Sequence, residues 1–126
     1  MAEENVTAVE TEEEVKEIKP IYLTGDRGEA YVLEFDRATV KYAEQRGFNT
    51  DAETIRITDA EELFHYAFRK HHPKLTKADT DKILYEKLHG FPKGMFDRLV
   101  ALFALPYNAL VQTEEDEKNA TMTAQF

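Results

Sequence analysis

The sequence predicts an α+β domain that is mainly α, in which an N-terminal β-hairpin precedes a bundle of three to four helices that includes a helical hairpin. Three observations support this prediction. Residues 20–35 contain two short apolar runs around a glycine-rich turn, residues 58–91 combine helical periodicity with capping signals, and residues 95–112 present a wide apolar face. Elements of this kind bury one face each, so together they form one small core.

Charge divides the chain into three parts. Residues 1–17 hold seven acidic residues and one lysine, and residues 114–126 hold four acidic residues and one lysine, so the two ends carry −6 and −3 of the net charge of −9. The part between them is therefore electrically balanced. A chain of 126 residues has room for one domain that folds on its own. The expected division is a disordered acidic tail at 1–17, a single globular domain at 18–112 and a flexible acidic and polar tail at 113–126.

Composition argues against several classes of protein. The chain has no cysteine, so it forms neither a disulfide framework nor a thiolate metal site, which is compatible with a reducing cytoplasm. It has no run of about 18 apolar residues and no basic and apolar leader, so we expect a soluble, unprocessed protein with no membrane partner. It also lacks the basic stripe with interleaved aromatic residues that is typical of nucleic-acid binding, so we expect no nucleic-acid partner.

The first expected element is the β-hairpin. Two apolar runs, residues 21–23 and 31–35, flank a turn that contains Gly25 and Gly28, and Pro20 places the first strand at an edge. The two glycines lack the Lys and the Ser or Thr that grip phosphate and metal in a phosphate-binding loop, so they indicate a turn.

A short helix follows the hairpin, with Asp36 as its expected N-cap and Gly47 where a left-handed C-terminal residue belongs. The next stretch, residues 54–58, alternates as a strand does, but a connecting loop or a partial helical turn fits nearly as well. The helical hairpin begins at the end of this stretch, with Thr58 or Asp59 as the expected N-cap of its first helix.

The helical hairpin carries the clearest periodicity. Its first helix has one apolar face and ends before Pro73, and a capping box of Thr76 and Asp79 starts the second helix, which ends at Gly90. The apolar face of the first helix consists of Ala60, Leu63, Phe64, Ala67, Phe68 and His71. The core contacts of the second helix are Ile83, Leu84 and Leu88.

The last helix, residues 95–112, is apolar around much of its circumference. It is therefore either the central helix of the domain or the helix that docks a partner. Pro106 removes one backbone hydrogen bond and should kink this helix or end it after Leu105. The widest apolar face comprises Phe96, Leu99, Val100, Phe103, Tyr107, Leu110 and Val111.

The polar residues show no catalytic signature. His65 and His72 lack the i, i+4 partner of a helical zinc site, and the preference of cations for a helix C-terminus accounts for His71 and His72. Asp79 and Asp81 stand in the first turn of a helix, where acidic residues complement the dipole. The chain has no serine, and no nucleophile motif surrounds a threonine. We expect no catalytic residue, no metal, no cofactor and no enzymatic activity.

Aromatic and large apolar residues are the remaining candidates for function. Tyr66 lies opposite the apolar face of its helix, and the last helix offers more apolar surface than so short a domain needs. The predicted partner-binding residues are Tyr66, Phe91, Met95, Phe96, Leu99, Phe103 and Tyr107.

The order of these features resembles the tail assembly chaperones of long-tailed bacteriophages and prophages over roughly residues 20–112. The most similar part is the helix with Leu63, Phe64, Ala67 and Phe68, the His72-Pro73 pair that follows, and the Leu75-Thr76 start of the next helix. The resemblance implies a non-enzymatic protein of the bacterial host cytoplasm. Such a protein binds the phage tape-measure protein, prevents its aggregation and assists the recruitment of tail-tube protein. The resemblance defines no binding residues that can be transferred to this sequence.

Two alternatives stay open. A small acidic regulatory adaptor or inhibitor would use its acidic tails to imitate nucleic acid, and removal of residues 1–17 would then abolish its activity. An uncovered last helix would favour self-association into a homo-oligomer, whereas a covered one would favour a monomer.

Overall fold

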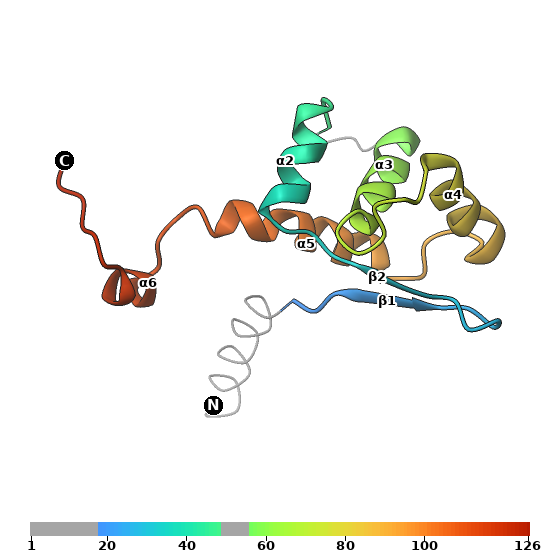
Figure 1. Cartoon of the computed structure of the whole chain (residues 1–126), viewed down its shortest axis with the longest axis horizontal. Helices are drawn as coiled ribbons and strands as arrows, with labels where there is room; N and C mark the ends of the chain where they lie inside the picture. Colours follow the sequence, from blue (N-terminus) through green and yellow to red (C-terminus); the bar gives the residue numbers. More distant parts are fainter. Residues whose placement is uncertain (1–17, 49–55) are drawn as a thin grey trace, which may run out of the picture.

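The computed structural model describes residues 18–48 and 56–126, and it confirms a mainly helical fold with an N-terminal two-stranded antiparallel hairpin (Figure 1). In chain order the elements are β1 (Ile21–Thr24), β2 (Ala30–Leu33), α2 (Arg37–Gln45), α3 (Ile57–Phe68), α4 (Lys77–Lys82), the π-helical segment η1 (Ile83–Lys87), α5 (Met95–Asn108) and α6 (Glu114–Asn119). The acidic tail predicted at residues 1–17 lies outside the described residues.

Helix α3 is the centre of the arrangement. It contacts α2, α4, α5 and β2, while β1 packs against α5. In Figure 1 the helices α2, α3 and α4 stand in a row, and α5 and the hairpin run across below them. The buried core consists of Leu33, Phe35, Val40, Ala43, Phe48, Leu63, Phe64, Tyr66, Ala67, Phe68, Ile83, Leu84, Met95, Leu99, Leu102 and Phe103. The predicted face of the first hairpin helix is therefore confirmed for Leu63, Phe64, Ala67 and Phe68.

The β-hairpin is held to the end of α3 by two backbone donors. Its register pairs Ile21 with Leu33, and the Gly25 N–H closes the turn by donating to the Glu29 carbonyl over 2.8 Å. On the outer edge of β2, the Val32 N–H donates to Nε2 of His72 at 3.0 Å. The next outward N–H, from Glu34, donates to the carbonyl of Ala67 at 3.1 Å. The helix end thus takes the place of a third strand beside β2.

Helix α2 begins and ends as predicted. The Asp36 carboxylate accepts a hydrogen bond from the Thr39 N–H at 2.8 Å, and the Thr39 hydroxyl accepts one from the Asp36 N–H at 2.8 Å. This reciprocal box satisfies two backbone donors that have no partner within the helix. At the other end Gly47 has a φ of 84°, a left-handed conformation that glycine adopts without strain.

We expect Asp36→Ala to lower the free energy of unfolding by about 1 kcal/mol, because the Thr39 N–H loses its acceptor at the start of a helix that packs on α3 and α5. Chemical denaturation of the full chain measures the loss. Thr113→Ala is the matched control, since Thr113 caps α6 in the same way but α6 has no buried residue. Equal losses in the two variants would contradict the argument that the cap acts through the packing of α2.

Helix α3 starts earlier than predicted. It begins at Ile57 with Arg56 as the N-cap, so the strand alternative for residues 54–58 is wrong for Ile57 and Thr58, and residues 49–55 lie outside the described part. Asp59 is not the N-cap. Its carboxylate accepts from the Arg56 N–H at 3.2 Å and pairs with the Arg56 guanidinium at 3.0 Å, and this side-chain bridge fixes the first turn.

The second half of the helical hairpin begins at the predicted capping box. The Thr76 hydroxyl accepts from the Asp79 N–H at 3.1 Å, and the Asp79 carboxylate accepts from the Thr76 N–H at 2.9 Å. After α4 the helix widens into η1, where the Leu88 N–H donates to the Ile83 carbonyl five residues back. Of the three predicted core residues, Ile83 and Leu84 are buried, and Leu88 is half-buried against the core.

Helix α5 passes through Pro106 and ends at Asn108. The expectation that proline would end the helix after Leu105 is therefore wrong, and so is a helix that reaches residue 112. Proline lacks one donor, but in the last turn this removes only the bond to one carbonyl. The region predicted as a C-terminal tail contains the short helix α6, whose residues are all exposed and which packs against no other described element.

Candidate partner-binding surface

The chain after Asn108 leaves apolar side chains uncovered. Leu110 and Val111 follow α5 in a turn, closed by the Leu110 N–H donating to the Tyr107 carbonyl at 3.1 Å. They are 72% and 73% exposed, and the neighbouring Tyr107 is 38% exposed. Adjacent exposed apolar residues of this size are typical of a surface that binds another molecule.

A groove lies beside these residues, between α2 and the end of α5. It has a volume of about 350 Å³. We call it the α2–α5 groove, and it is lined by Arg37, Val40, Lys41 and Glu44 on one side and by Pro106, Tyr107, Ala109 and Leu110 on the other. A groove of this kind, with an apolar wall and a polar rim, is suited to the apolar face of a helix.

Tyr107 joins the two sides of the α2–α5 groove. Its hydroxyl donates a hydrogen bond to the carboxylate of Glu44, and its ring centroid lies 5.8 Å from that of Phe103. Partial burial, together with the bond to Glu44, raises the pKa of Tyr107 to about 12. The hydroxyl therefore stays protonated at neutral pH and remains a donor that fixes the ring at the groove.

The α2 rim of the groove is basic. Arg37 and Lys41 are exposed, and neither forms an ion pair with a residue of the described part of the chain. Among the described residues that line the groove, Glu44 is the only acidic one, and its carboxylate is engaged by Tyr107. A helix that combines an apolar face with acidic residues along one border would complement this arrangement.

The structure buries four of the seven predicted partner-binding residues, namely Tyr66, Met95, Leu99 and Phe103. In this fold these side chains reach a partner only if the core opens. The expectation that Tyr66 lies opposite the buried face of α3 is wrong, because α2 and the segment after it cover that side of the helix. The ring centroid of Tyr66 lies 6.1 Å from that of Tyr42 and 5.4 Å from that of Phe48.

The other three predicted residues lie at the surface. Phe91 and Phe96 are half-buried against the core, with their ring centroids 5.5 Å apart, and only Tyr107 lines the α2–α5 groove. Sequence reasoning placed Leu110 and Val111 on the wide apolar face of a longer helix, which was either core or docking surface, and did not select them as partner-binding residues. The signal that could have found them is Pro106, since a helix that ends soon after proline leaves the following apolar residues without cover.

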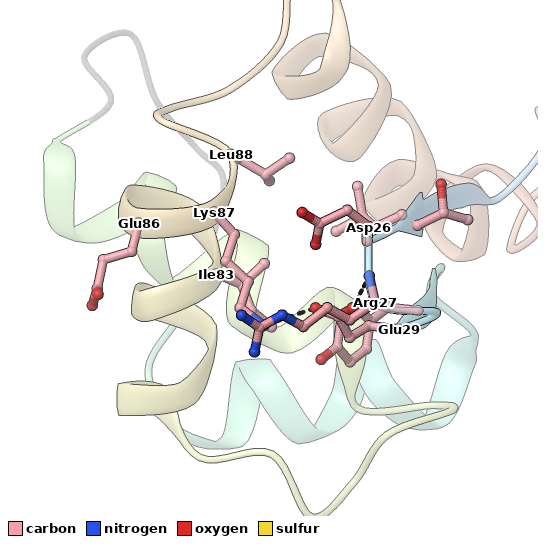
Figure 2. Close-up of a pocket in the computed structure, with 11 residues that line it drawn as sticks. Asp26, Arg27, Glu29, Ile83, Glu86, Lys87 and Leu88 are labelled. Atoms are coloured by element: carbon pink, nitrogen blue, oxygen red, sulfur yellow. Dashed lines mark hydrogen bonds and ion pairs between the residues drawn. The ribbon is translucent and has the colours of Figure 1, made fainter.

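A second concavity, of about 530 Å³, lies between the hairpin loop and η1, which face each other in Figure 2. Its central carboxylate is already paired, because Glu29 accepts from the Arg27 N–H at 2.9 Å and from the Lys87 ammonium at 3.2 Å. Hydrogen bonds from its own backbone N–H and from Lys87 hold the pKa of Glu29 below its usual 4.5. Asp26, Arg27 and Glu86 also line this concavity, but their arrangement indicates no particular ligand, and we assign no site to it.

Three of the four histidines make contacts that hold the fold together. His72 accepts from Val32, Nδ1 of His65 lies 3.0 Å from the Thr80 hydroxyl, and His71 pairs with Glu34. Because α3 ends at Phe68, these contacts replace the helix-dipole explanation for His71 and His72. The face predicted to include His71 ends before it, and His71 is exposed. Within residues 18–48 and 56–126, no three His, Asp or Glu side chains gather in an arrangement that could hold a metal ion.

Comparison with protein families covers nearly the whole chain. The family described as a domain of unknown function (DUF5055) matches residues 7–126, which include every described helix and strand. The chain belongs to the DUF5055 family. Comparisons with curated proteins and with solved structures found no match.

The DUF5055 match includes both the hairpin and the α2–α5 groove, so both are parts of the domain that defines the family. The candidate site is therefore a surface of the DUF5055 domain itself.

No helix in the described part of this DUF5055 chain is long and apolar enough to cross a membrane.

Proposed function

We propose that this protein is a phage tail assembly chaperone, a non-enzymatic protein that binds the tape-measure protein and assists assembly of the tail tube. The observation that carries the proposal is the uncovered apolar surface at and just after the end of α5, where Tyr107 and Leu110 line the α2–α5 groove and the exposed Val111 follows them. The order of sequence features that resembles such chaperones supports it as well. The client segment would be an amphipathic helix that lays its apolar face into the groove.

The size of the apolar patch suits transient binding. Full burial of two side chains such as Leu110 and Val111 contributes roughly 3–6 kcal/mol before the entropic cost of association is subtracted. A single contact of this strength corresponds to roughly millimolar affinity or weaker. Several copies along one long helical client would therefore be needed for stable cover, and each copy could be displaced when tube subunits arrive.

Co-expression of the full chain with the tape-measure protein tests the proposal. Wild-type chain should keep the tape-measure protein in the soluble fraction, and the double variant Leu110→Asp, Val111→Asp should reduce the soluble amount at least tenfold, because two charges enter the apolar contact. Ile57→Asp is the matched control. The exposed fraction of Ile57, 75%, is close to the 72% of Leu110 and the 73% of Val111. Ile57 lies at the start of α3, however, and does not line the groove.

The proposal would be contradicted if the double variant kept the tape-measure protein as soluble as the wild type does, or if the wild-type chain gave no soluble tape-measure protein.

The acidic adaptor or inhibitor is a second candidate, favoured by the exposed run of four acidic residues at 114–117 in α6. Changing those four residues to glutamine separates the two functions. The change removes four of the acidic charges that would imitate nucleic acid, so it should weaken an inhibitor, and it leaves Leu110 and Val111 in place.

A further inference from the structure

The β2 edge of the hairpin is partly covered and the β1 edge is open. On β2 the outward backbone donors of Val32 and Glu34 are used by His72 and Ala67. On β1 the register decides which backbone groups point outward. The Gly25 N–H donates to the Glu29 carbonyl across the hairpin. Because hydrogen-bonded and non-hydrogen-bonded pairs alternate along antiparallel strands, the backbone N–H and C=O groups of Ile21 and Leu23 point toward β2.

The backbone groups of Tyr22 and Thr24 therefore point away from β2. No described residue donates to their carbonyls or accepts from their N–H groups, and both residues are exposed, Tyr22 by 66%. Unpaired strand edges are templates for another strand, and proteins normally cover or charge them. In Figure 1 the side of β1 away from β2 is not covered by any described element.

A groove runs beside this open edge. It has a volume of about 460 Å³ and is lined by residues 20–23, residues 92–95 and Arg98. No residue of β2 lines it, so it lies on the β1 side of the hairpin. Leu23 and Met95 supply apolar surface within it.

The charge around the open edge is positive. Lys93 and Arg98 line the groove, Lys19 precedes β1, and none of the three forms an ion pair with any residue in 18–48 or 56–126. The N-terminus of the 14-residue helix α5 opens at Gly94 in the same groove and adds the positive end of its dipole. None of the described residues that line the groove is acidic.

We propose that the β1 edge binds an extended segment of a partner polypeptide as a third strand, and that acidic side chains of this segment meet Lys93 and Arg98. Backbone hydrogen bonds to Tyr22 and Thr24 supply the pairing, and the basic groove selects the charge. A second copy of this chain fits less well, because it would bring the same basic groups to the interface twice.

This surface is distinct from the one proposed to hold the apolar client. The β1 edge lies at the start of α5 and the α2–α5 groove at its end, about 20 Å apart along a helix of 14 residues. The inference goes beyond the chaperone proposal, and its failure would leave that proposal untouched. A protein with both surfaces would join two partners, an apolar helix and an acidic extended segment.

Fluorescence anisotropy with the full chain tests the inference. The probe is a labelled peptide of about eight residues that alternates glutamate and valine, the length of an ordinary strand. We expect saturable binding that weakens as salt is added, and at least tenfold weaker binding of the matched peptide that alternates lysine and valine.

Tyr22→Pro is the decisive variant. It removes an N–H that points away from β2, so the hairpin ladder stays intact while the outer edge loses a donor, and binding of the acidic peptide should weaken at least tenfold. Circular dichroism checks the fold of this variant. Lys93→Glu provides a second route that leaves the strand unchanged, and it should weaken binding and reduce the salt dependence. Leu110→Asp should bind the peptide as the wild type does.

Three peptide-binding results would each overturn the inference. They are equal binding of the two peptides, acidic-peptide binding that both Tyr22→Pro and Lys93→Glu leave unchanged, and no binding of either peptide. Sedimentation of the wild type as a dimer that Tyr22→Pro converts to a monomer would also overturn it, because the edge would then pair with a second copy.

Discussion

Replacing Phe103 by alanine should lower the free energy of unfolding by about 3–5 kcal/mol, the cost of emptying a large aromatic site in a packed core. Phe103 is 1% exposed on α5. Its ring meets those of Phe35 and Phe48 edge to face, with centroids 5.0 Å and 5.4 Å away. A loss of this size is a large part of the total stability of a small domain, so the denaturation midpoint of the full chain should fall clearly.

Leu110→Ala is the matched control for Phe103→Ala. Both residues are large and apolar and belong to the C-terminal part of the domain, but Leu110 is 72% exposed. We expect its truncation to change the free energy of unfolding by less than about 0.5 kcal/mol. The two substitutions should therefore have different effects: Phe103→Ala should lower stability, and Leu110→Ala should weaken binding of the client. An unchanged stability of Phe103→Ala together with lost binding would instead mean that Phe103 belongs to a surface.

Local signals in the sequence predicted the parts of the fold that local chemistry determines. The caps of α2 and α4 were found because Asp36, Thr76 and Asp79 act on backbone groups three residues away. The hairpin turn was found because glycine is the residue that such turns favour. In the structure Gly28 has a φ of 85°, where other residues are strained. Each of these features needs only a few neighbouring residues, so one sequence is sufficient to predict it.

The parts that sequence reasoning missed depend on contacts between distant elements. Periodicity showed which side of α3 is most apolar, but not that α2 would cover the opposite side and bury Tyr66. It showed that the last helix is apolar, but not that its start and middle would fill the core while Leu110 and Val111 emerge past its end. The candidate site consists of what remains uncovered after packing, and apart from Pro106 near the end of α5 no local pattern indicates it.

The contact between His72 and Val32 is the clearest example, since 40 residues separate them. We expect His72→Ala to lower the free energy of unfolding by about 1–3 kcal/mol near pH 7.5, because the part-buried Val32 N–H loses its acceptor. The ring of His72 also packs against Tyr31 and Phe68, with centroids 5.3 Å and 6.2 Å away. His71→Ala is the control, because His71 is an exposed neighbour whose pair with Glu34 is worth at most about 1 kcal/mol.

The same contact should make stability depend on pH. Nε2 of His72 accepts the hydrogen bond only while it carries no proton, and burial lowers the pKa of His72 below its usual 6.5, with the neighbouring His71 acting in the same direction. Between this lowered pKa and 6.5 the unfolded chain binds more protons than the folded one. The contribution of His72 is therefore complete above pH 6.5 and is lost as the pH falls through that interval.

Denaturation near pH 7.5 and near pH 5.5 should therefore show a smaller acid-induced loss of stability in His72→Ala than in the wild type. Some loss should remain, because burial lowers the pKa of His65 in the same way and its ring stays in contact with Thr80. Equal losses in the wild type and the variant, or a gain of stability on acidification, would show that His72 does not hold the hairpin as a neutral acceptor. A larger decrease in the wild type and in His71→Ala than in His72→Ala would assign this part of the pH dependence to the bond between β2 and the end of α3.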